Sequence, residues 1–195
     1  MSSAWVWGAV AVAVGFFVGA VSPATIVARL RRADLTQGSG NPGATNTGRL
    51  LGLRWGVVVG VFDVLKGLVP TLVALLWLGR PTAYAVGLAC ILGHVLSPYL
   101  HGRGGKGVAT SLGAILAVFP VLAVGLVALF GLILWRTRWV AGASLAAAVA
   151  LALWAVFGPL PEPVLLGRVW GLAVALLIVA RHERNIRGWL RQRRS

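Results

Sequence analysis

A glycine-rich polar segment, residues 37–49, has the composition of an anion-binding loop. Its glycines permit unusual backbone dihedrals and close approach to a ligand, and its hydroxyl and amide side chains offer hydrogen bonds. Arg49 adds a guanidinium whose planar fork matches phosphate oxygens. The side chains expected to contact an anion are Ser39, Asn41, Thr45, Asn46 and Arg49. The alternative is a solvated turn cluster that only joins two helices.

A second glycine-rich segment, residues 101–110, holds Lys106 among Gly104, Gly105 and Gly107 and leads into a stretch predicted to be helical. Backbone N–H groups at a helix start, with the helix dipole, would face an anion, and Lys106 would add a point charge. The segment is not a Walker A motif, because Gly107 replaces the required Ser or Thr, so ATP hydrolysis is not predicted. Alternatively, the lysine only reaches lipid head groups.

Three further polar groups lie in or beside apolar stretches. Asp63 and Lys66 are spaced i, i+3 and share a helix face. Either they form a structural ion pair, or Lys66 reaches the anion expected at the two glycine-rich segments. His182 and Asn185 also share a helix side; they line a site or belong to a cationic tail on an anionic leaflet. His94 is either a core histidine or part of the polar floor of a site.

Residue patterns for several other chemistries are missing. No His and Cys cluster predicts a metal site, and four acidic residues leave no credible Ser-His-Asp set. No histidine is followed by Asp at a His-x₄-Asp spacing, which is one pattern for acid–base chemistry. A metal, a cofactor and a covalent enzyme intermediate are therefore not expected. Cys90 has no disulfide partner and is expected to act as a small hydrophobe.

The composition requires an apolar environment for the elements that position these groups. Of 195 residues, 58% are hydrophobic and only 11% charged, whereas soluble domains are about one-quarter charged. Eighteen Lys and Arg against four acids give a net charge of +14. Because these cations flank long apolar stretches, the partner expected is anionic lipid or substrate, and nucleic acid is not expected.

Hydropathy predicts an all-α, polytopic membrane protein with about seven spans, near residues 4–28, 55–79, 82–100, 108–119, 120–135, 139–158 and 165–181. The first stretch lacks the basic start of a signal peptide and is interpreted as a span. A hairpin at Phe119-Pro120 is preferred to one long helix, because it places most basic residues on one side.

This arrangement puts the N-terminus outside and the C-terminus in the cytoplasm. The chain is then a single membrane-embedded domain, residues 1–195, with cytoplasmic motif loops near 29–54, 101–107 and 181–195. Only Arg80 and Arg168 fall outside, in agreement with the positive-inside rule.

The ordered set of motifs resembles the PlsY family, bacterial membrane acyl-phosphate:glycerol-3-phosphate acyltransferases. The resemblance rests on residues 38–49, the segment 63–67, the loop 104–110 and His182 with Asn185-Ile186. It therefore extends over nearly the whole chain. Each motif alone is weak, whereas their order and intervals together are specific.

The resemblance implies transfer of a fatty acyl group from acyl phosphate to the 1-hydroxyl of glycerol 3-phosphate. The products would be lysophosphatidic acid and inorganic phosphate, made for phospholipid synthesis at the cytoplasmic side of a bacterial plasma (inner) membrane. One copy of the chain in membrane lipid is expected to suffice. Carried over by position, the implied catalytic residues are Ser39, Arg49, Lys106, His182 and Asn185. The residues expected to bind phosphate are Asn41, Thr45, Asn46, Lys66, Gly104, Gly105 and Gly107.

The sequence departs from the family pattern in three places: at residues 19–23, in the linker 34–37, and at Ala141, where a serine is expected. Ser144 is a candidate substitute for that serine.

Acyl phosphate is a mixed anhydride, so the enzyme must mainly neutralise phosphate and align a hydroxyl with the acyl carbon. Two proton acceptors stay open: His182, or the substrate phosphate with His182 and Asn185 only positioning the hydroxyl. The second is slightly favoured. The rival class is an anion transporter with the same cationic loops, although no inverted repeat supports it.

Overall fold

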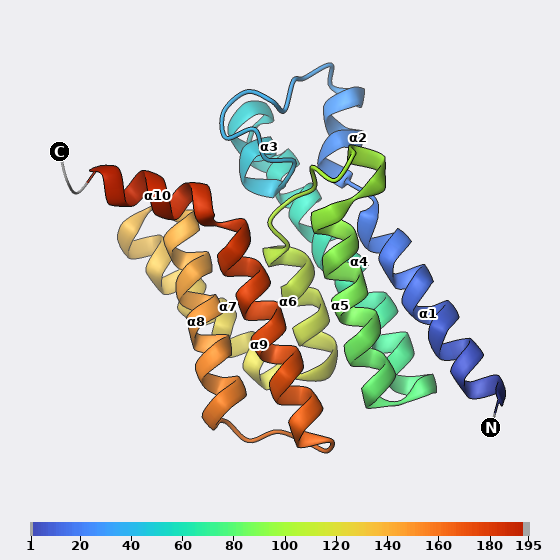
Figure 1. Cartoon of the computed structure of the whole chain (residues 1–195). Coiled ribbons are helices and arrows are strands. Elements are labelled where there is room, and N and C mark those ends of the chain that lie inside the picture. Colours follow the sequence, from blue (N-terminus) through green and yellow to red (C-terminus); the bar gives the residue numbers. More distant parts are fainter. Residues whose placement is uncertain (1, 193–195) are drawn as a thin grey trace. The chain divides into compact units, whose positions relative to one another are not determined.

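The structure is a computed structural model that describes residues 2–192, and every regular element in that range is helical (Figure 1). The predicted all-α class is therefore confirmed. Arg193 and Arg194, in the predicted cytoplasmic tail, lie outside the described residues. The helices are α1 (Ser2–Ala20), α2 (Pro23–Leu30), α3 (Ala44–Leu51), α4 (Leu53–Leu78), α5 (Arg80–Leu96), the 3₁₀ turn η1 (Pro98–Leu100), α6 (Val108–Val118), α7 (Pro120–Thr137), α8 (Val140–Phe157), α9 (Val164–Arg181) and α10 (Glu183–Gln192).

Within residues 2–192, six helical stretches are long and apolar enough to cross a membrane. They are Trp5–Leu30, Leu53–Leu78, Arg80–Leu100, Pro120–Thr137, Val140–Phe157 and Val164–Arg181, close to six of the predicted spans. The seventh predicted span is α6, which has only 11 residues. At 1.5 Å per residue it is about 16 Å long, against roughly 30 Å of hydrocarbon. A count of seven crossings therefore stays a prediction.

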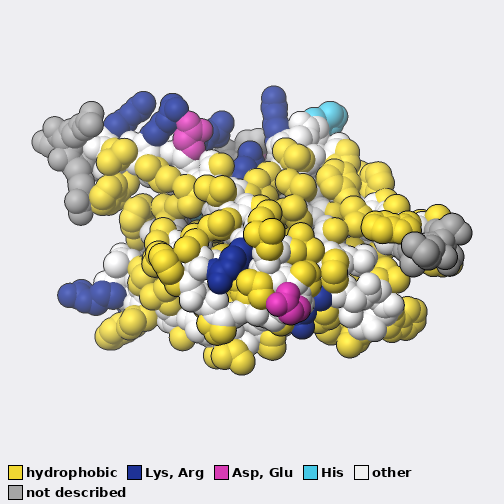
Figure 2. All heavy atoms as spheres, turned by 60° about the horizontal axis from the view of Figure 1, so that its bottom comes forward, with side chains coloured by type: hydrophobic (Ala, Val, Ile, Leu, Met, Phe, Trp, Pro, Cys, Tyr) yellow, Lys and Arg dark blue, Asp and Glu magenta, His cyan; other side chains and the backbone are white. Residues whose placement is uncertain are grey.

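The surface is that of a protein solvated by lipid. Trp5, Trp77 and Val121 are each more than 80% exposed, and many other large apolar side chains are exposed with them. Hydrophobic side chains occupy most of the face seen in Figure 2. Exposed apolar area on this scale marks contact with a membrane or a partner. The prediction of a membrane protein agrees with this surface.

The chain forms two compact units, Met1–Pro120 and Val121–Ser195, which are described separately. In the first unit, α1 lies along α5, and α4 packs against both α5 and α6 (Figure 1). In the second unit, α8 packs against α9, and α10 follows α9. The single domain spanning residues 1–195 stays a prediction.

Direct backbone contact between α4 and α6 sets the position of the second glycine-rich loop. A Cβ atom on Gly67 would overlap the Thr110 carbonyl oxygen, and one on Gly113 would overlap the Val64 carbonyl oxygen. Small residues allow such close approach between membrane helices. The start of α6 is thus held next to α4, and Lys106 lies two residues before this helix.

The first predicted span is not one helix, because α1 ends at Ala20 and α2 begins at Pro23. Proline is favoured in the first turn of a helix, and the Ser22 side chain accepts a hydrogen bond from the Thr25 backbone N–H at 3.3 Å. A polar cap followed by proline therefore starts a new helix inside an apolar run. The break also releases carbonyl groups of α1 from helical hydrogen bonding.

The prediction of an irregular loop over residues 37–49 is wrong for its second half, where α3 begins at Ala44. Gly43 takes the N-cap position, and the Thr47 hydroxyl donates to the Gly43 carbonyl at 3.1 Å. Thr45, Asn46 and Arg49 are therefore helical residues. The turn-forming residues that precede Ala44 favour a loop in the sequence, and a helix of only 8 residues is too short to show a clear periodic pattern.

Candidate active site

The first glycine-rich segment is organised by one buried side chain, Asn46, which is 1% exposed. Its amide nitrogen donates to the carbonyls of Leu35 and Gln37 at 3.0 and 3.1 Å. Its amide oxygen accepts from the Ser39 backbone N–H at 3.0 Å. Gly38 packs against that oxygen with a positive φ of 66°. Asn46, predicted to bind phosphate, thus holds the loop in shape through its side chain.

The other candidate residues of this segment face outward. Ser39, Thr45 and Arg49 are exposed, and Asn41 is half-buried. Thr45 and Arg49 are four residues apart on α3 and so share one face of that helix. The Thr45 hydroxyl and the Arg49 guanidinium therefore lie on the same exposed face of α3, next in sequence to a loop whose backbone is held by the buried Asn46 side chain.

The entry to this segment is a turn closed by Asp34. Its carboxylate accepts from the Thr36 backbone N–H at 2.9 Å and from the Thr36 hydroxyl at 2.7 Å. These hydrogen bonds favour the charged form and lower the pKa of Asp34 from its usual value. The turn carries the only carboxylate between residues 29 and 54.

The second glycine-rich loop is attached to the end of α5. The N–H groups of Gly104 and Gly105 donate to the carbonyls of Val95 and His94, each at 3.1 Å. The expectation that the loop amides face an anion therefore does not hold for these two groups. The N–H groups of the first turn of α6, which follows Gly107 at a φ of 82°, remain the candidate donors beside half-buried Lys106.

Lys66 belongs to a buried network in the first unit. Its ammonium lies 2.8 Å from Asp63 Oδ1, donates to the Val21 carbonyl at 2.7 Å and lies 2.8 Å from His94 Nδ1. The structure therefore contains the ion pair that was one of the two interpretations of Asp63 and Lys66. Lys66 connects to the second loop through His94, which the sequence left unassigned.

His182 and Asn185 lie where α9 passes into α10. His182 is 2% exposed and is the last residue before α10, and its Nδ1 lies 2.8 Å from the Ile178 carbonyl oxygen. A carbonyl oxygen only accepts, so Nδ1 carries a proton and Nε2 is the acceptor of the neutral ring. The Asn185 N–H donates to the His182 carbonyl at 2.9 Å.

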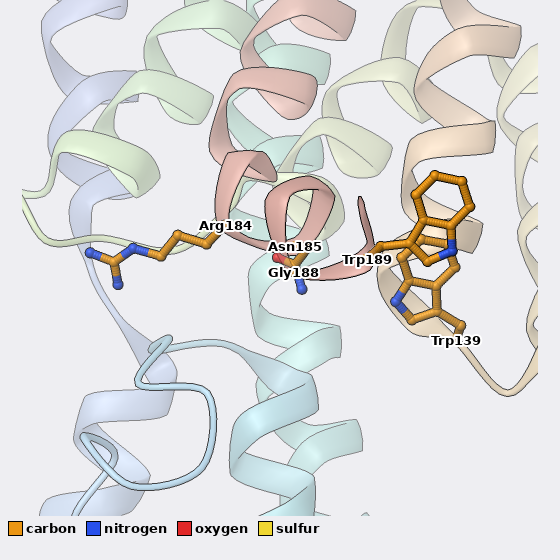
Figure 3. Close-up of a pocket in the computed structure, with 5 residues that line it drawn as sticks. All are labelled: Trp139, Arg184, Asn185, Gly188 and Trp189. Carbon is orange, nitrogen blue, oxygen red and sulfur yellow. The ribbon is translucent and has the colours of Figure 1, made fainter. Parts of the chain in front are cut away.

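A cavity of about 250 Å³ opens beside Asn185 in the second unit. It is lined by Trp139, Arg184, Asn185, Gly188 and Trp189, and Figure 3 shows the two indoles together, with Arg184 extending away from them. The indole rings stack at 6.0 Å with an interplanar angle of 12°, which joins the start of α8 to α10. Sequence reasoning missed this pair, because tryptophans 50 residues apart carry no local signal.

Ser144, the candidate substitute for the serine expected at Ala141, is buried on α8. Its hydroxyl donates to the Val140 carbonyl at 2.9 Å, one turn earlier. That Ser144 substitutes for the missing serine stays a prediction.

The candidate catalytic residues are divided between the two units: Ser39, Arg49 and Lys106 belong to the first, and His182 and Asn185 belong to the second. Among residues 2–192 there is no group of three or more His, Cys, Asp or Glu side chains that could hold a metal ion.

Comparison with known proteins covers almost the whole chain. A family profile described as glycerol-3-phosphate acyltransferase matches residues 9–192. The glycerol-3-phosphate acyltransferase of Geobacter sulfurreducens is 42% identical over 177 residues, which is 90% of each chain. Glycerol-3-phosphate acyltransferase 1 of Deinococcus radiodurans is 41% identical over 180 residues, covering 91% of this chain and 89% of the relative.

A solved structure agrees with these relatives. The crystal structure of PlsY (YgiH), an integral membrane glycerol 3-phosphate acyltransferase in its glycerol 3-phosphate form, matches with a TM-score of 0.89 at 34% identity. The match covers 95% of this chain and 93% of that one. The lysophosphatidic acid form of the same protein matches with a TM-score of 0.87.

The six long apolar helices, together with the match to an integral membrane acyltransferase, define an integral membrane enzyme of the acyltransferase class. The chain belongs to the glycerol-3-phosphate acyltransferase family. The resemblance to PlsY is confirmed, and so is the expectation of an acyltransferase. The transporter alternative has no support among these relatives.

Replacing Asn46 by Asp tests whether this side chain organises the first loop. The carboxylate would lose the two donated hydrogen bonds and leave the Leu35 and Gln37 carbonyls without their donor, each hydrogen bond contributing about 0.5–1.5 kcal/mol. We expect faster amide hydrogen exchange over residues 35–47 and at least tenfold lower activity. The control is Gln192→Glu, the same amide-to-carboxylate change at the end of α10 in the second unit; equal exchange over residues 35–47 in both variants would contradict the role.

Proposed function

We propose that this chain transfers a fatty acyl group from acyl phosphate to the 1-hydroxyl of glycerol 3-phosphate. The hydroxyl oxygen bonds to the acyl carbon, the bond from that carbon to the phosphate oxygen breaks, and lysophosphatidic acid and inorganic phosphate leave. The observation that carries the proposal is the match over residues 9–192 to one acyltransferase family. The relative solved with glycerol 3-phosphate supports this acceptor.

The chemistry requires charge neutralisation more than activation. Phosphate is already a good leaving group in a mixed anhydride, and both substrates bring negative charge. Arg49 and Lys106 supply positive charge from exposed and half-buried positions of the first unit. In our proposal Ser39, Asn41, Thr45 and the first turn of α6 add neutral donors. Fixed donors around developing charge are an effective means of catalysis in a site from which water is excluded.

Gly104, Gly105, Lys66 and Asn46 have a supporting role in this proposal. Their contacts hold the two loops in shape, as the hydrogen bonds of Gly104, Gly105 and Asn46 and the buried position of Lys66 indicate. Gly107 allows the positive φ at which α6 begins. Phosphate contact then falls to the exposed side chains and to Lys106.

His182 and Asn185 orient the glycerol hydroxyl, and the substrate phosphate accepts its proton. With a proton on Nδ1, the imidazole of His182 offers Nε2 as a hydrogen-bond acceptor to that hydroxyl. A phosphate group with a pKa near 6 then takes the proton within the site. No metal or cofactor is required for these steps, and all the groups come from one copy of the chain.

We place the reaction at the cytoplasmic face of a bacterial plasma membrane, with α6 as a short seventh crossing. The N-terminus then lies outside and the C-terminus inside. Most cations lie on the loop that carries α3, on the second glycine-rich loop, at the end of α7 and on α10, and these segments are all cytoplasmic in this topology.

The orientation can be measured because the chain has a single cysteine. In a Cys90→Ala background, Gln37→Cys and Glu162→Cys place thiols on two exposed loops. We expect a membrane-impermeant maleimide to label residue 162 on intact spheroplasts and residue 37 only after lysis. Labelling of both positions from the same side would exclude an odd number of crossings between them.

His182→Gln separates positioning from general-base catalysis. Glutamine can still accept a hydrogen bond from the hydroxyl but cannot take its proton, so we expect only a few-fold loss of kcat. Asn185→Ala should lower it far more. General-base catalysis typically contributes about 10²–10⁴-fold, so a loss of that size in His182→Gln would assign the base to His182.

The reaction itself is tested by inorganic phosphate release from the purified protein in lipid. We expect release from palmitoyl phosphate only when glycerol 3-phosphate is present, with lysophosphatidic acid formed in equal amount. Arg49→Ala should lower the rate by about 10²–10³-fold, as loss of one charge-stabilising donor does. Absence of turnover in the wild-type protein, with phosphate crossing sealed vesicles, would instead indicate a transporter.

A further inference from the structure

His94 lies at the end of a buried polar chain that begins at the break between α1 and α2. Lys66 Nζ is surrounded by the Val21 carbonyl at 2.7 Å, Asp63 Oδ1 at 2.8 Å and His94 Nδ1 at 2.8 Å. Asp63, Lys66 and His94 are 3%, 8% and 8% exposed. Water therefore has little access, and the protein itself sets the hydrogen-bonding pattern.

This pattern defines the tautomer of His94. An ammonium group has three donors and no acceptor, so in its 2.8 Å contact with His94 Nδ1 it can only donate. His94 Nδ1 therefore accepts from Lys66, and the ring proton is on Nε2. A proton on Nδ1 directed at Asp63 is disfavoured, because Oδ1 lies 3.6 Å away, beyond hydrogen-bond distance.

The opposite side of the ring meets the second glycine-rich loop. A Cβ atom on Gly105 would overlap His94 Nε2, so the imidazole edge packs directly against the Gly105 backbone. The Gly105 N–H donates to the carbonyl of His94 itself, and the Gly104 N–H donates to the next carbonyl, that of Val95. Lys106 is the next residue in the chain. Residue 94 thus touches the loop with both backbone and ring.

We propose that His94 is a positioning residue of the acyl transfer reaction, which holds the Gly104–Gly107 loop so that Lys106 meets the substrate phosphate. Asp63 and Lys66 set its tautomer, and the Nε2–H edge supports Gly105. His94 acts through the loop and does not contact the substrate. The proposal rests on the proposed function, in which Lys106 neutralises phosphate.

Two variants separate the two nitrogens of the ring. In His94→Asn, the side-chain oxygen can still accept from Lys66, but nothing reaches the Nε2 position. In His94→Gln, the longer side chain places an N–H donor near that position. We expect kcat/KM to fall by about 10–10²-fold in His94→Asn, as loss of alignment does, and to recover to within about threefold of wild type in His94→Gln.

His101 provides a matched control. It is an exposed histidine at the start of the same loop, with a φ of 51° that asparagine tolerates. We expect His101→Asn to keep wild-type kcat/KM. An equal loss in His101→Asn and His94→Asn would overturn the proposal.

A double-mutant cycle with Lys106 identifies the route of the effect. If His94 acts by placing Lys106, then His94→Asn should cost less than about threefold in a Lys106→Ala background. The same 10–10²-fold cost in both backgrounds would show a general structural effect and overturn the proposal. Thermal unfolding of each variant is measured in lipid beside the kinetics. If His94→Asn does not fold, His94→Gln decides alone: a loss above tenfold in the folded His94→Gln protein overturns the proposal. Near-wild-type activity of His94→Gln supports it.

Amide hydrogen exchange gives a readout that does not depend on activity. We expect faster exchange at Gly104 and Gly105 in His94→Asn than in His101→Asn, with α4 unchanged. Equal exchange in the two variants would contradict the role of the ring even if activity falls. An inactive wild-type protein would refute the proposed reaction and leave this measurement of the loop intact.

Discussion

A helix break inside an apolar bundle leaves carbonyl groups that only the protein can satisfy, and much of the first unit is organised around that requirement. The Ala20 carbonyl accepts from the Ser97 hydroxyl at 2.7 Å, and the Val21 carbonyl accepts from Lys66 at 2.7 Å. These donors come from the end of α5 and from α4. The break therefore ties three helices together at the point where the second loop begins.

The Lys66 ammonium, which donates to the Val21 carbonyl, would be costly to bury without partners. An ammonium group in a membrane interior needs a counter-ion and hydrogen-bond acceptors, and Asp63 and His94 provide them. Because the ion pair is spaced i, i+3 on one helix, its geometry is set by α4 alone. The third acceptor comes from α5, so the same interaction that neutralises a buried lysine also orients His94.

Both glycine-rich loops have a backbone that is held by buried groups of the protein. The Asn46 side chain holds the first loop with three hydrogen bonds, whereas the backbone carbonyls of His94 and Val95 hold the second, against which the His94 ring also packs. In the second unit, His182 is held by a backbone carbonyl of its own helix, which defines the tautomer of its ring. Preorganised loops need little rearrangement when anionic substrates bind.

The sequence by itself determined the class of the fold, most of the helix positions and the family. Long apolar runs must form helices in lipid, because every backbone polar group has to be paired within the segment. The glycine-rich motifs could be found in the sequence because a loop conformation depends on the local backbone freedom that glycine gives. The family resemblance rests on these short motifs in order, and it was correct.

Only the tertiary structure decided which motif residues support the loops and which face outward. Asn46 and Arg49 lie in the same motif, yet one is buried under the loop and the other is exposed. The role of His94 depends on partners 28 and 31 residues away on another helix. The stack of Trp139 on Trp189 likewise joins distant segments. Such roles arise from packing between helices, which the periodicity of a single segment does not encode.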